Sequence, residues 1–497
     1  MLTAAIFVPL AASVVLALAK LDSTDARTVR LLRAGATVAA AVPLLLLAIA
    51  WSRFEGTGGF ELVEHVPWIP TLGIGYTVGV DGVSLPLAAM SALLFTVAIA
   101  YPTDLRGRAR AYFALFLFLQ AASLGVFLAL DLFLFFVFWD VSLVGMYFLI
   151  GVWGHGDAQR SALKFFIYTF AGSLALLLGI IGLYLATEPR TFDMATIIAQ
   201  QPLEGGGLYA TLVFVGLAVG FAVKTPLVPV HTWLPPAHVD APGPASAVLA
   251  GVLLKMGTYG FVRIPMSMQP DTFARFAFPL GVLAVVAIVY GALVALAQTD
   301  VKRLIAYTSI NHMGYVILGL AAAGAGIGGQ QAAQAVALTG ATVEMVAHGL
   351  ITGVLFLVSG SILSRGQTYE MDAYGGLAAR APVLTAFTTI AAFASLGLPG
   401  LAGFVAEFQI FTGTLAVYPW LAGLGLIGIV LTAALFLRML QKLFLGPLPE
   451  RWAGWSDLGR VETTALAMLL IFVVVIGVSP AWLLDVIDST AGPFVGR

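Results

Sequence analysis

The sequence predicts an all-α membrane protein that crosses the bilayer about fourteen times. Of its 497 residues, 60% are hydrophobic and only 10% are charged, whereas a soluble chain of this length needs far more charge on its surface. Apolar stretches of about 20 residues, the length that spans a bilayer as a helix, recur from one end of the sequence to the other. The chain is therefore expected to be a polytopic membrane protein.

The expected spans follow one another through short connections. In chain order their approximate limits are 2–19, 31–51, 82–101, 111–129, 131–152, 163–186, 208–229, 243–265, 273–297, 303–322, 335–363, 382–418, 420–445 and 462–484. The first begins at Leu2 with no basic region before it, so we expect a transmembrane helix there rather than a cleaved signal peptide.

Two of these spans contain residues that interrupt helices. The seventh runs into the proline-rich stretch KTPLVPVHTWLPPAHVDAPGP (224–244), and the twelfth contains SLGLPGLAGFVAEF (395–408). In the latter, Gly397, Pro399 and Gly400 should end the helix. A broken membrane helix persists only where protein or a water-filled cavity satisfies the freed backbone groups. Two interruptions five helices apart suggest two related halves, as in inverted-repeat transporters.

Basic residues are distributed unequally between alternate loops, when each loop takes the number of the span it follows. Odd-numbered loops carry seventeen: Lys20, Arg27, Arg30, Arg33, Arg106, Arg108, Arg110, Arg160, Lys164, Lys302, Arg303, Arg365, Arg380, Arg438, Lys442, Arg451 and Arg460. Even-numbered loops and the C-terminus carry five: Arg53, Arg190, Arg263, Arg275 and Arg497. Since Lys and Arg accumulate in cytoplasmic loops, the odd loops should face the cytoplasm and both termini should lie outside it. An error of one in the helix count would remove this asymmetry.

Several ionisable residues fall inside the predicted spans. They are Asp140, Lys224, Lys255, Glu344 and Glu407, with His312 and His348 at comparable depth. Five unpaired charges at about 3 kcal/mol each would cost on the order of 15 kcal/mol in the bilayer, so pairing or neutralisation must reduce that cost. Desolvated carboxyls, lysines and histidines can exchange protons near neutral pH, as a proton relay requires.

The charged members of this set also have structural interpretations. Asp140 and Lys224 could form a static ion pair that fixes helix packing. Lys255 could extend to the membrane surface or bond a carbonyl of a broken helix. Glu407, beside the Gly/Pro break, has the weakest structural explanation. A set of acidic, basic and histidine groups spread over six helices is more than static packing requires, which favours a relay.

The histidines are open to the same two interpretations. His312 and His348 could each be hydrogen-bonded core residues. Glu344 lies four residues before His348 and shares its helix face, so it could simply orient that imidazole. His231 and His238 flank the HTWLPPAH turn and could be loop ligands or helix caps.

Other kinds of site are excluded by composition and spacing. The chain has no cysteine, so it cannot hold an iron–sulfur cluster through thiolates. We find no dinucleotide or phosphate-binding glycine motif and no HExxH pair, and a net charge of −1 gives no reason to expect nucleic acid. His65 and His155 are expected near the surface and receive no role. Any redox cofactor must therefore belong to another subunit.

Seven segments together carry a resemblance to a known family. They are WDVSLVGMYFLIGVWG, ALKFFIYTFAGSLALLLG, KTPLVPVHTWLPPAH, AGVLLKMGTYGFVRIP, KRLIAYTSINHMGYVILGL, MVAHGLITGVLFLVSGSI and GLPGLAGFVAEF. From about Gly79 to Leu445 the chain resembles the antiporter-like membrane subunits of respiratory complex I, specifically subunit M (chain 4) of proton-pumping NADH:quinone oxidoreductase. The resemblance implies two inverted five-helix repeats, at 111–265 (helices 4–8) and 273–445 (helices 9–13), with helices 1–3 at 1–110 and the last helix and tail at 446–497.

The resemblance also implies roles for the buried residues. Asp140 stands where the family has a glutamate on the fifth helix, ion-paired with Lys224 on the broken seventh helix. Lys255 would be the central relay lysine, and Glu407 the terminal proton site on the broken twelfth helix. His312 and His348 would line the hydrated path between them.

Three positions depart from the family pattern. Asp140 is one methylene shorter than glutamate, which should weaken its pair with Lys224 or make water necessary. Pro236 stands where HTWLPDAH usually has aspartate. Glu344 stands where glutamine is expected, and adds a protonatable group to the path.

The resemblance implies a proton-translocating subunit without a cofactor of its own, in the bacterial inner membrane. FMN, iron–sulfur clusters and quinone are expected in partner subunits of a hetero-oligomer, with antiporter-like neighbours on both sides and lipids around them. The alternatives are a subunit of a multisubunit Na⁺/H⁺ antiporter, a subunit of a related ferredoxin- or hydrogenase-linked complex, and a membrane spacer whose charges only assemble helices.

Overall fold

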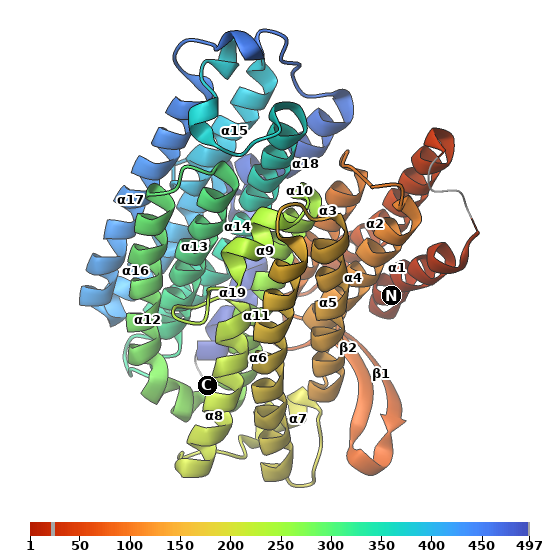
Figure 1. Cartoon of the computed structure of the whole chain (residues 1–497). Helices are drawn as coiled ribbons and strands as arrows, with labels where there is room; N and C mark the ends of the chain where they lie inside the picture. The colour runs from red at the N-terminus through yellow and green to blue at the C-terminus, as the bar shows by residue number, and fades with distance from the viewer. Residues whose placement is uncertain (21–24, 496–497) are drawn as a thin grey trace.

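The computed structural model describes residues 1–20 and 25–495, and within them the chain is almost entirely helical (Figure 1). Ten helices in these ranges are long and apolar enough to cross a membrane, and five shorter apolar helices accompany them. The all-α membrane class is therefore confirmed, while the number fourteen remains a prediction. Arg497, one of the basic residues used to predict orientation, lies outside the described residues.

The helices follow the order expected from the apolar segments. The first part of the chain forms α1 (Leu2–Leu18), α2 (Ala26–Arg53), α3 (Ser84–Ala100), α4 (Ala109–Leu128), α5 (Leu132–Trp153), α6 (Ala158–Ala186) and α8 (Leu208–Lys224). The second part forms α12 (Pro270–Leu296), α13 (Val301–Ala323), α14 (Gln331–Gly366), α15 (Pro382–Ser395), α16 (Ala402–Val417), α17 (Pro419–Phe444) and α18 (Arg460–Val478). Short 3₁₀ turns lie at Pro70–Leu72, Met371–Ala373, Leu377–Ala379 and Glu450–Trp452.

Both predicted helix interruptions are confirmed. Helix α8 ends at Lys224, and the short α9 (Leu234–Asp240) begins only after a proline-containing turn. Helix α15 ends at Ser395 and α16 begins at Ala402. Gly397, between them, has a φ of +75°, a left-handed conformation that non-glycine residues rarely adopt.

The eighth predicted span is one continuous but irregular helical segment. It consists of α10 (Gly243–Val248), a π-helical turn (Leu249–Leu253), α11 (Leu254–Phe261) and a second π-helical turn (Val262–Met266). A π turn shifts the backbone bonding from i→i−4 to i→i−5 and leaves carbonyl groups less regularly paired. The eight residues of α11 therefore lie between two places where polar side chains can reach the backbone.

Besides the short 3₁₀ turns, five elements were not predicted, namely α9, two strands and two further helices, and the last predicted span extended beyond the helix that forms there. An antiparallel hairpin, β1 (Glu61–Ile69) with β2 (Ile74–Val80), follows α2, and α7 (Met194–Gln200) follows α6. The expected helix 462–484 stops at Val478, and α19 (Ala481–Val495) follows as a separate helix. Pro480 separates them, because proline lacks the N–H that would continue α18. The missed elements are shorter than a bilayer span and too short to register as apolar segments.

Connections that alternate along the chain meet at opposite ends of the helix bundle. At one end the backbone N–H of His155, which follows α5, donates to the carbonyl of Asp240, the last residue of α9 (2.8 Å). At the other end, where Figure 1 shows the hairpin and α7, the Leu130 N–H donates to the Thr77 carbonyl (2.9 Å). This grouping agrees with the alternation of odd and even loops on which the orientation prediction depends.

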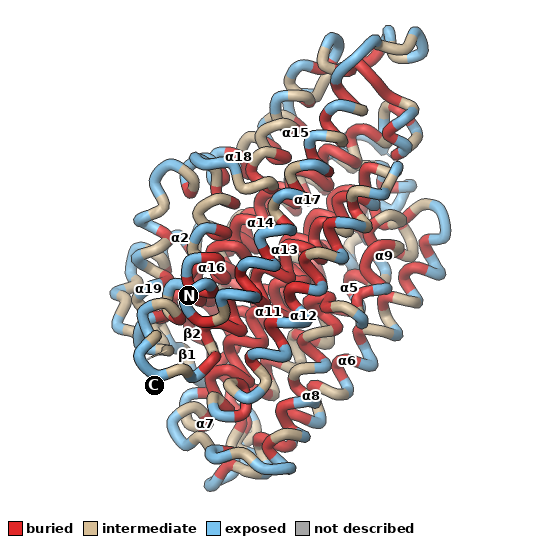
Figure 2. The backbone as a smooth tube through the Cα atoms, turned by 90° about the vertical axis from the view of Figure 1, so that its left-hand side faces the viewer, coloured by how far each residue is buried: buried red, intermediate tan, exposed pale blue. Residues whose placement is uncertain are grey.

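Helices α11, α13 and α14 are among the most deeply buried, and buried residues form continuous stretches along them in Figure 2. Two basic residues that were counted as loop charges lie in helical segments and are buried. Lys302 is 0% exposed and Arg263 is 3% exposed. The Arg263 guanidinium donates to Asp81 (2.6 Å) and to the Tyr259 hydroxyl (3.0 Å), which compensates its burial.

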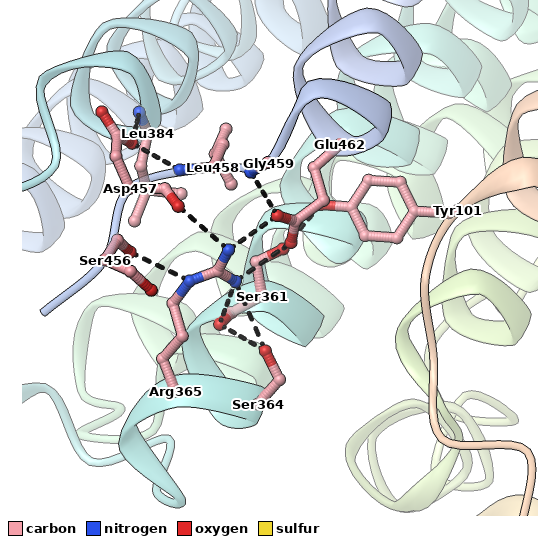
Figure 3. Close-up of polar contacts among 10 residues, drawn as sticks. All are labelled: Tyr101, Ser361, Ser364, Arg365, Leu384, Ser456, Asp457, Leu458, Gly459 and Glu462. Carbon is pink, nitrogen blue, oxygen red and sulfur yellow. Dashed lines mark hydrogen bonds and ion pairs between the residues drawn. The ribbon is translucent and has the colours of Figure 1, made fainter.

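Helix α15 is anchored at the end that lies away from its break (Figure 3). Asp457 accepts from the backbone N–H groups of Val383 (2.8 Å) and Leu384 (3.0 Å) in its first turn. Arg365, in the last turn of α14, donates to both carboxylate oxygens of Glu462 on α18 (3.0 and 2.6 Å) and to the Asp457 carbonyl (3.2 Å). The two arrangements tie α14, α15 and α18 together at this end.

Candidate functional site

Lys255 lies at the centre of the bundle and is completely buried. Its ammonium donates to the Ala250 carbonyl in the preceding π turn (2.6 Å) and lies 2.5 Å from Nδ1 of His348 on α14. An ammonium has three protons and no acceptor, so His348 presents an unprotonated Nδ1 to it. The carbonyl bond, which was one structural alternative for Lys255, is present, and His348 adds a second titratable group.

A line of polar groups continues from His348 into the second half of the chain. The imidazole rings of His348 and His312 have centroids 5.3 Å apart. Nδ1 of His312 lies 3.1 Å from Glu344 Oε1, and its Nε2 lies 3.0 Å from the Ser395 hydroxyl. All four side chains are buried. Three helices, α13, α14 and α15, thus supply one connected polar array that begins at Lys255.

Glu407 lies beyond Ser395, across the break between α15 and α16. It is 4% exposed, and a Cβ at Gly397 would meet its carboxyl group directly. The glycine is therefore required both by its left-handed φ and by the close approach of this carboxyl. The break places Ser395, the last residue of α15, and Glu407, on α16, at the same irregular point of the chain.

Lys224 ends α8 and is also buried, but it does not form the expected ion pair with Asp140. No nitrogen–oxygen distance between the two side chains is within 4.0 Å in the part of the chain that the structure describes. The Lys224 ammonium instead donates to the Ser142 hydroxyl (3.3 Å) and lies 5.1 Å from the centre of the Trp139 ring. The structure corrects the prediction of a direct pair.

Asp140 does not pair directly with Lys224 because its side chain is short and because of its position on α5. Ser142 lies two residues along the helix, about 200° around its axis, so the face of α5 that reaches Lys224 is the serine face. Asp140 is only partly buried, yet its Oδ1 is inaccessible and has no hydrogen-bond partner in the described residues. Aspartate, one methylene shorter than glutamate, therefore leaves a carboxylate oxygen unsatisfied between the helix and its surroundings.

The helices that carry Lys224 and Lys255 touch directly. A Cβ at Gly257 would lie only 2.8 Å from the backbone nitrogen of Thr225, the residue after Lys224. Glycine at this position lets α11 approach the end of α8. The contact joins the lysine on the broken seventh span to the lysine on the eighth.

The two histidines of the HTWLPPAH turn, His231 and His238, lie in different surroundings. His231 Nε2 lies 3.3 Å from the Tyr290 hydroxyl and makes no contact with the array. His238 is 0% exposed and stacks on Phe356 of α14 (ring centroids 4.5 Å). Neither of its ring nitrogens has a partner in the described residues. The sequence left His238 undecided, and its depth depends on a turn that folds back into the bundle.

The described residues 1–20 and 25–495 contain no group of three or more His, Asp or Glu side chains that could hold a metal ion. The buried groups of the site are carboxyl, imidazole and amine side chains. Carboxyl, imidazole and amine groups within hydrogen-bond distance are the usual participants in proton transfer.

A family model described as "NADH:quinone oxidoreductase/Mrp antiporter, TM" matches residues 129–432. NADH-quinone oxidoreductase subunit M of Rhodobacter capsulatus is 39% identical, over 98% of this chain and 95% of that protein. F(420)H(2) dehydrogenase subunit M of Methanosarcina mazei is 37% identical, over 90% of each. A solved chain of respiratory complex I from Thermus thermophilus with bound NADH superposes with a TM-score of 0.88 at 29% identity, over 100% of both chains. The resemblance to subunit M is thereby confirmed, and the chain belongs to the NADH:quinone oxidoreductase/Mrp antiporter family of membrane subunits.

Proposed function

We propose that this chain translocates protons through its buried polar array as a membrane subunit of NADH:quinone oxidoreductase, while quinone is reduced in other subunits. The observation that carries the proposal is the connected series Lys255, His348, His312 and Ser395, with Glu344 beside it. These groups are buried, close together, and able to accept and donate protons. FMN, iron–sulfur clusters and quinone are assigned to partner subunits.

The first step of the mechanism involves Lys224. Its ammonium is stabilised by the Ser142 hydroxyl and the Trp139 ring, and Asp140 attracts it from farther away. A charge change in a neighbouring subunit alters the balance between Asp140 and Lys224. When Lys224 is less well neutralised, its field disfavours a second positive charge on Lys255, because α8 and α11 are in contact.

The second step moves a proton along the array. Lys255 gives its proton to His348, and the adjacent ring of His312 receives it in turn. Glu344 stabilises the positive charge on His312 at 3.1 Å. The Ser395 hydroxyl passes the proton across the break to Glu407, which releases it on the far side. Lys255 then takes up a proton from the cytoplasmic side, so each group ends in its starting protonation state after one proton has crossed.

The orientation completes the proposal. The excess of basic residues on odd loops assigns that end of the bundle to the cytoplasm and both termini to the outside of a bacterial inner membrane. The segments 111–265 and 273–445 act as two inverted repeats, flanked by 1–110 and 446–497. Other membrane subunits and lipids cover the exposed apolar faces.

The test is the substitution Lys255→Met in the assembled complex. Methionine is close to lysine in length but cannot carry a proton, so the number of protons pumped per electron should fall by the share of this subunit. Lys20→Met, on an exposed residue, is the matched control and should leave the ratio unchanged. An unchanged ratio in an intact Lys255→Met complex would exclude the proposed path.

A second candidate follows from the breadth of the matching family. Its model covers Mrp antiporters, and one of the relatives belongs to an F(420)H(2) dehydrogenase. Purification of the chain in mild detergent distinguishes these cases. Flavin and iron–sulfur absorbance that bleaches with NADH supports the main proposal; bleaching only with another donor changes the parent enzyme. A colourless preparation whose transport depends on sodium supports the antiporter.

A further inference from the structure

A cavity of about 570 Å³ opens at the end of the bundle assigned to the cytoplasm. It lies against the turn between α5 and α6 and is lined by Arg106, His155, Asp157 and Arg160 among others. The cavity is polar and open to solvent, so water and protons reach the His155 side chain. His155 lies outside the spans, and burial, followed by the positive charges of Lys302 and Arg106, lowers its pKa to about 4. Its imidazole is therefore neutral at pH 7 and can accept a proton.

A buried lysine lies directly behind this histidine. The rings of His155 and Tyr369 have centroids 5.5 Å apart, and the Lys302 ammonium lies 5.2 Å from the centre of the Tyr369 ring. Lys302 is 0% exposed. It donates to the carbonyl groups of Val239 (3.3 Å) and Ala241. Thus one ammonium occupies the space between the surface turn and the segment that connects α9 to α10.

Three residues near Lys302 carry unpartnered polar atoms. They are Nε2 of His155, the hydroxyl of Tyr369, and both ring nitrogens of His238, the residue before Val239, and none of them has a partner in the described residues. Buried polar groups are nearly always hydrogen-bonded to protein or ordered water, and each one left unpaired costs about 1–3 kcal/mol. Ordered water in a narrow passage is the usual partner for buried polar atoms of this kind.

The inner end of this passage reaches the array described above. The positive charges of Lys302 and Lys255 both act on His238. The carbonyl of His238 accepts from the hydroxyl of Ser246 (3.0 Å) on α10, and α10 leads through the π turn to Lys255. His238 is therefore held between the two buried lysines by backbone as well as by stacking on Phe356.

We propose that His155, Tyr369, Lys302 and His238 form the uptake route that carries protons from the cytoplasmic cavity to Lys255. This inference rests on the proposed function. A proton enters at His155 and is relayed past the Tyr369 hydroxyl to Lys302, whose own proton has moved on to His238. His238 then protonates Lys255 after Lys255 has discharged to His348. One proton enters, one arrives, and every group returns to its initial state.

The substitution Lys302→Arg tests the central step. Arginine keeps the positive charge and the donors for the two carbonyl groups, but it does not release a proton in proteins. The assembled complex should therefore form normally, while its ratio of protons to electrons falls to the value of Lys255→Met. Lys20→Arg is the matched control and should retain the normal ratio. A normal ratio in Lys302→Arg would overturn the proposed route.

Chemical rescue of a His155 variant shows whether the imidazole of His155 transfers protons or only packs against its neighbours. His155→Ala should lower the proton flux through this subunit by about 10-fold or more, and imidazole added on the cytoplasmic side should restore it through the open cavity. Rescue by a series of substituted imidazoles of similar size should follow their proton affinity. Absence of rescue, or rescue that follows size alone, would contradict a relay role for His155.

The same measurements distinguish this inference from the proposed function. If Lys255→Met lowers the ratio while Lys302→Arg and His155→Ala do not, the uptake route is wrong and the proposed function stands. If the complex with Lys255→Met pumps like the unmodified complex, both the uptake route and the proposed function are overturned. Equal losses in Lys255→Met and Lys302→Arg, with rescue of His155→Ala, support both.

Discussion

The ammonium of Lys255 on α11 and Nδ1 of His348 on α14 are 2.5 Å apart, within a completely buried hydrogen bond. The two residues are separated by 93 positions in the sequence. Their contact joins the first half of the chain to the second, and each of the following predictions concerns a group on one side of that junction or the framework that maintains it.

His348→Gln should preserve assembly and lower proton pumping strongly. Glutamine can still accept a hydrogen bond from Lys255, but an amide does not take up a proton near neutral pH. Loss of a general acid–base group typically lowers a rate by about 10²–10⁴-fold. Acidification of inverted membrane vesicles per NADH oxidised measures the effect. His65→Gln, in the β-hairpin, is the control, and near-normal pumping in His348→Gln would show that His348 only accepts the lysine hydrogen bond.

Glu344→Gln and Glu344→Leu together distinguish the effect of the negative charge of Glu344 from its role as a hydrogen-bond acceptor for His312. Glutamine retains an acceptor for Nδ1 of His312, so the complex should assemble, but loss of the negative charge should slow pumping by several-fold because a protonated His312 is less well stabilised. Leucine also leaves the buried Nδ1 without a partner, at about 1–3 kcal/mol, and should be more damaging. If the glutamine variant pumps normally and only the leucine variant fails, Glu344 serves to orient the imidazole.

Asp140→Glu and Asp140→Asn test how the length and the charge of the side chain at position 140 act on Lys224. The additional methylene brings the carboxylate nearer to the Lys224 ammonium and should strengthen the attraction that aspartate exerts from farther away. Asparagine has the shape of aspartate without its charge and should lower coupled pumping by about tenfold or more, equivalent to 1.4 kcal/mol. Electron transfer and proton pumping are measured on the same vesicles. Wild-type coupling in Asp140→Asn would show that this carboxylate takes no part.

Arg365→Ala should destabilise the complex without acting on the polar array. The substitution leaves Glu462 without its bidentate partner, although the pair is 17% and 11% exposed, so the loss should be about 1–3 kcal/mol rather than that of a fully buried pair. The thermal transition in detergent should fall by several degrees. Arg460→Ala, at an exposed site in the same region, should not change it. Equal transition temperatures for the two variants would exclude the role of the Arg365–Glu462 pair as an anchor.

The membrane class, the order of the helices and both helix interruptions could be predicted because they depend on local properties. Apolar length determines whether a segment can span a bilayer, and the residues at 395–400 break a helix whatever surrounds them. Each buried ionisable residue was also recognisable alone, because a charge inside an apolar run is costly wherever the helix packs. The hairpin, α7 and α19 were missed because their apolar segments are shorter than a span.

Which buried groups meet was decided by tertiary packing. Lys302 and Arg263 were counted as loop charges, but the folded chain buries both of them. Lys224 was expected to pair with Asp140, yet the rotation of α5 and the short aspartate side chain present Ser142 to it. The contact of Lys255 with His348 depends on α10, α11 and α14 packing across a long separation in sequence. Composition determines that such charges need partners, whereas only the packing of the helices selects the partners, because distance and direction govern hydrogen bonds and proton transfer.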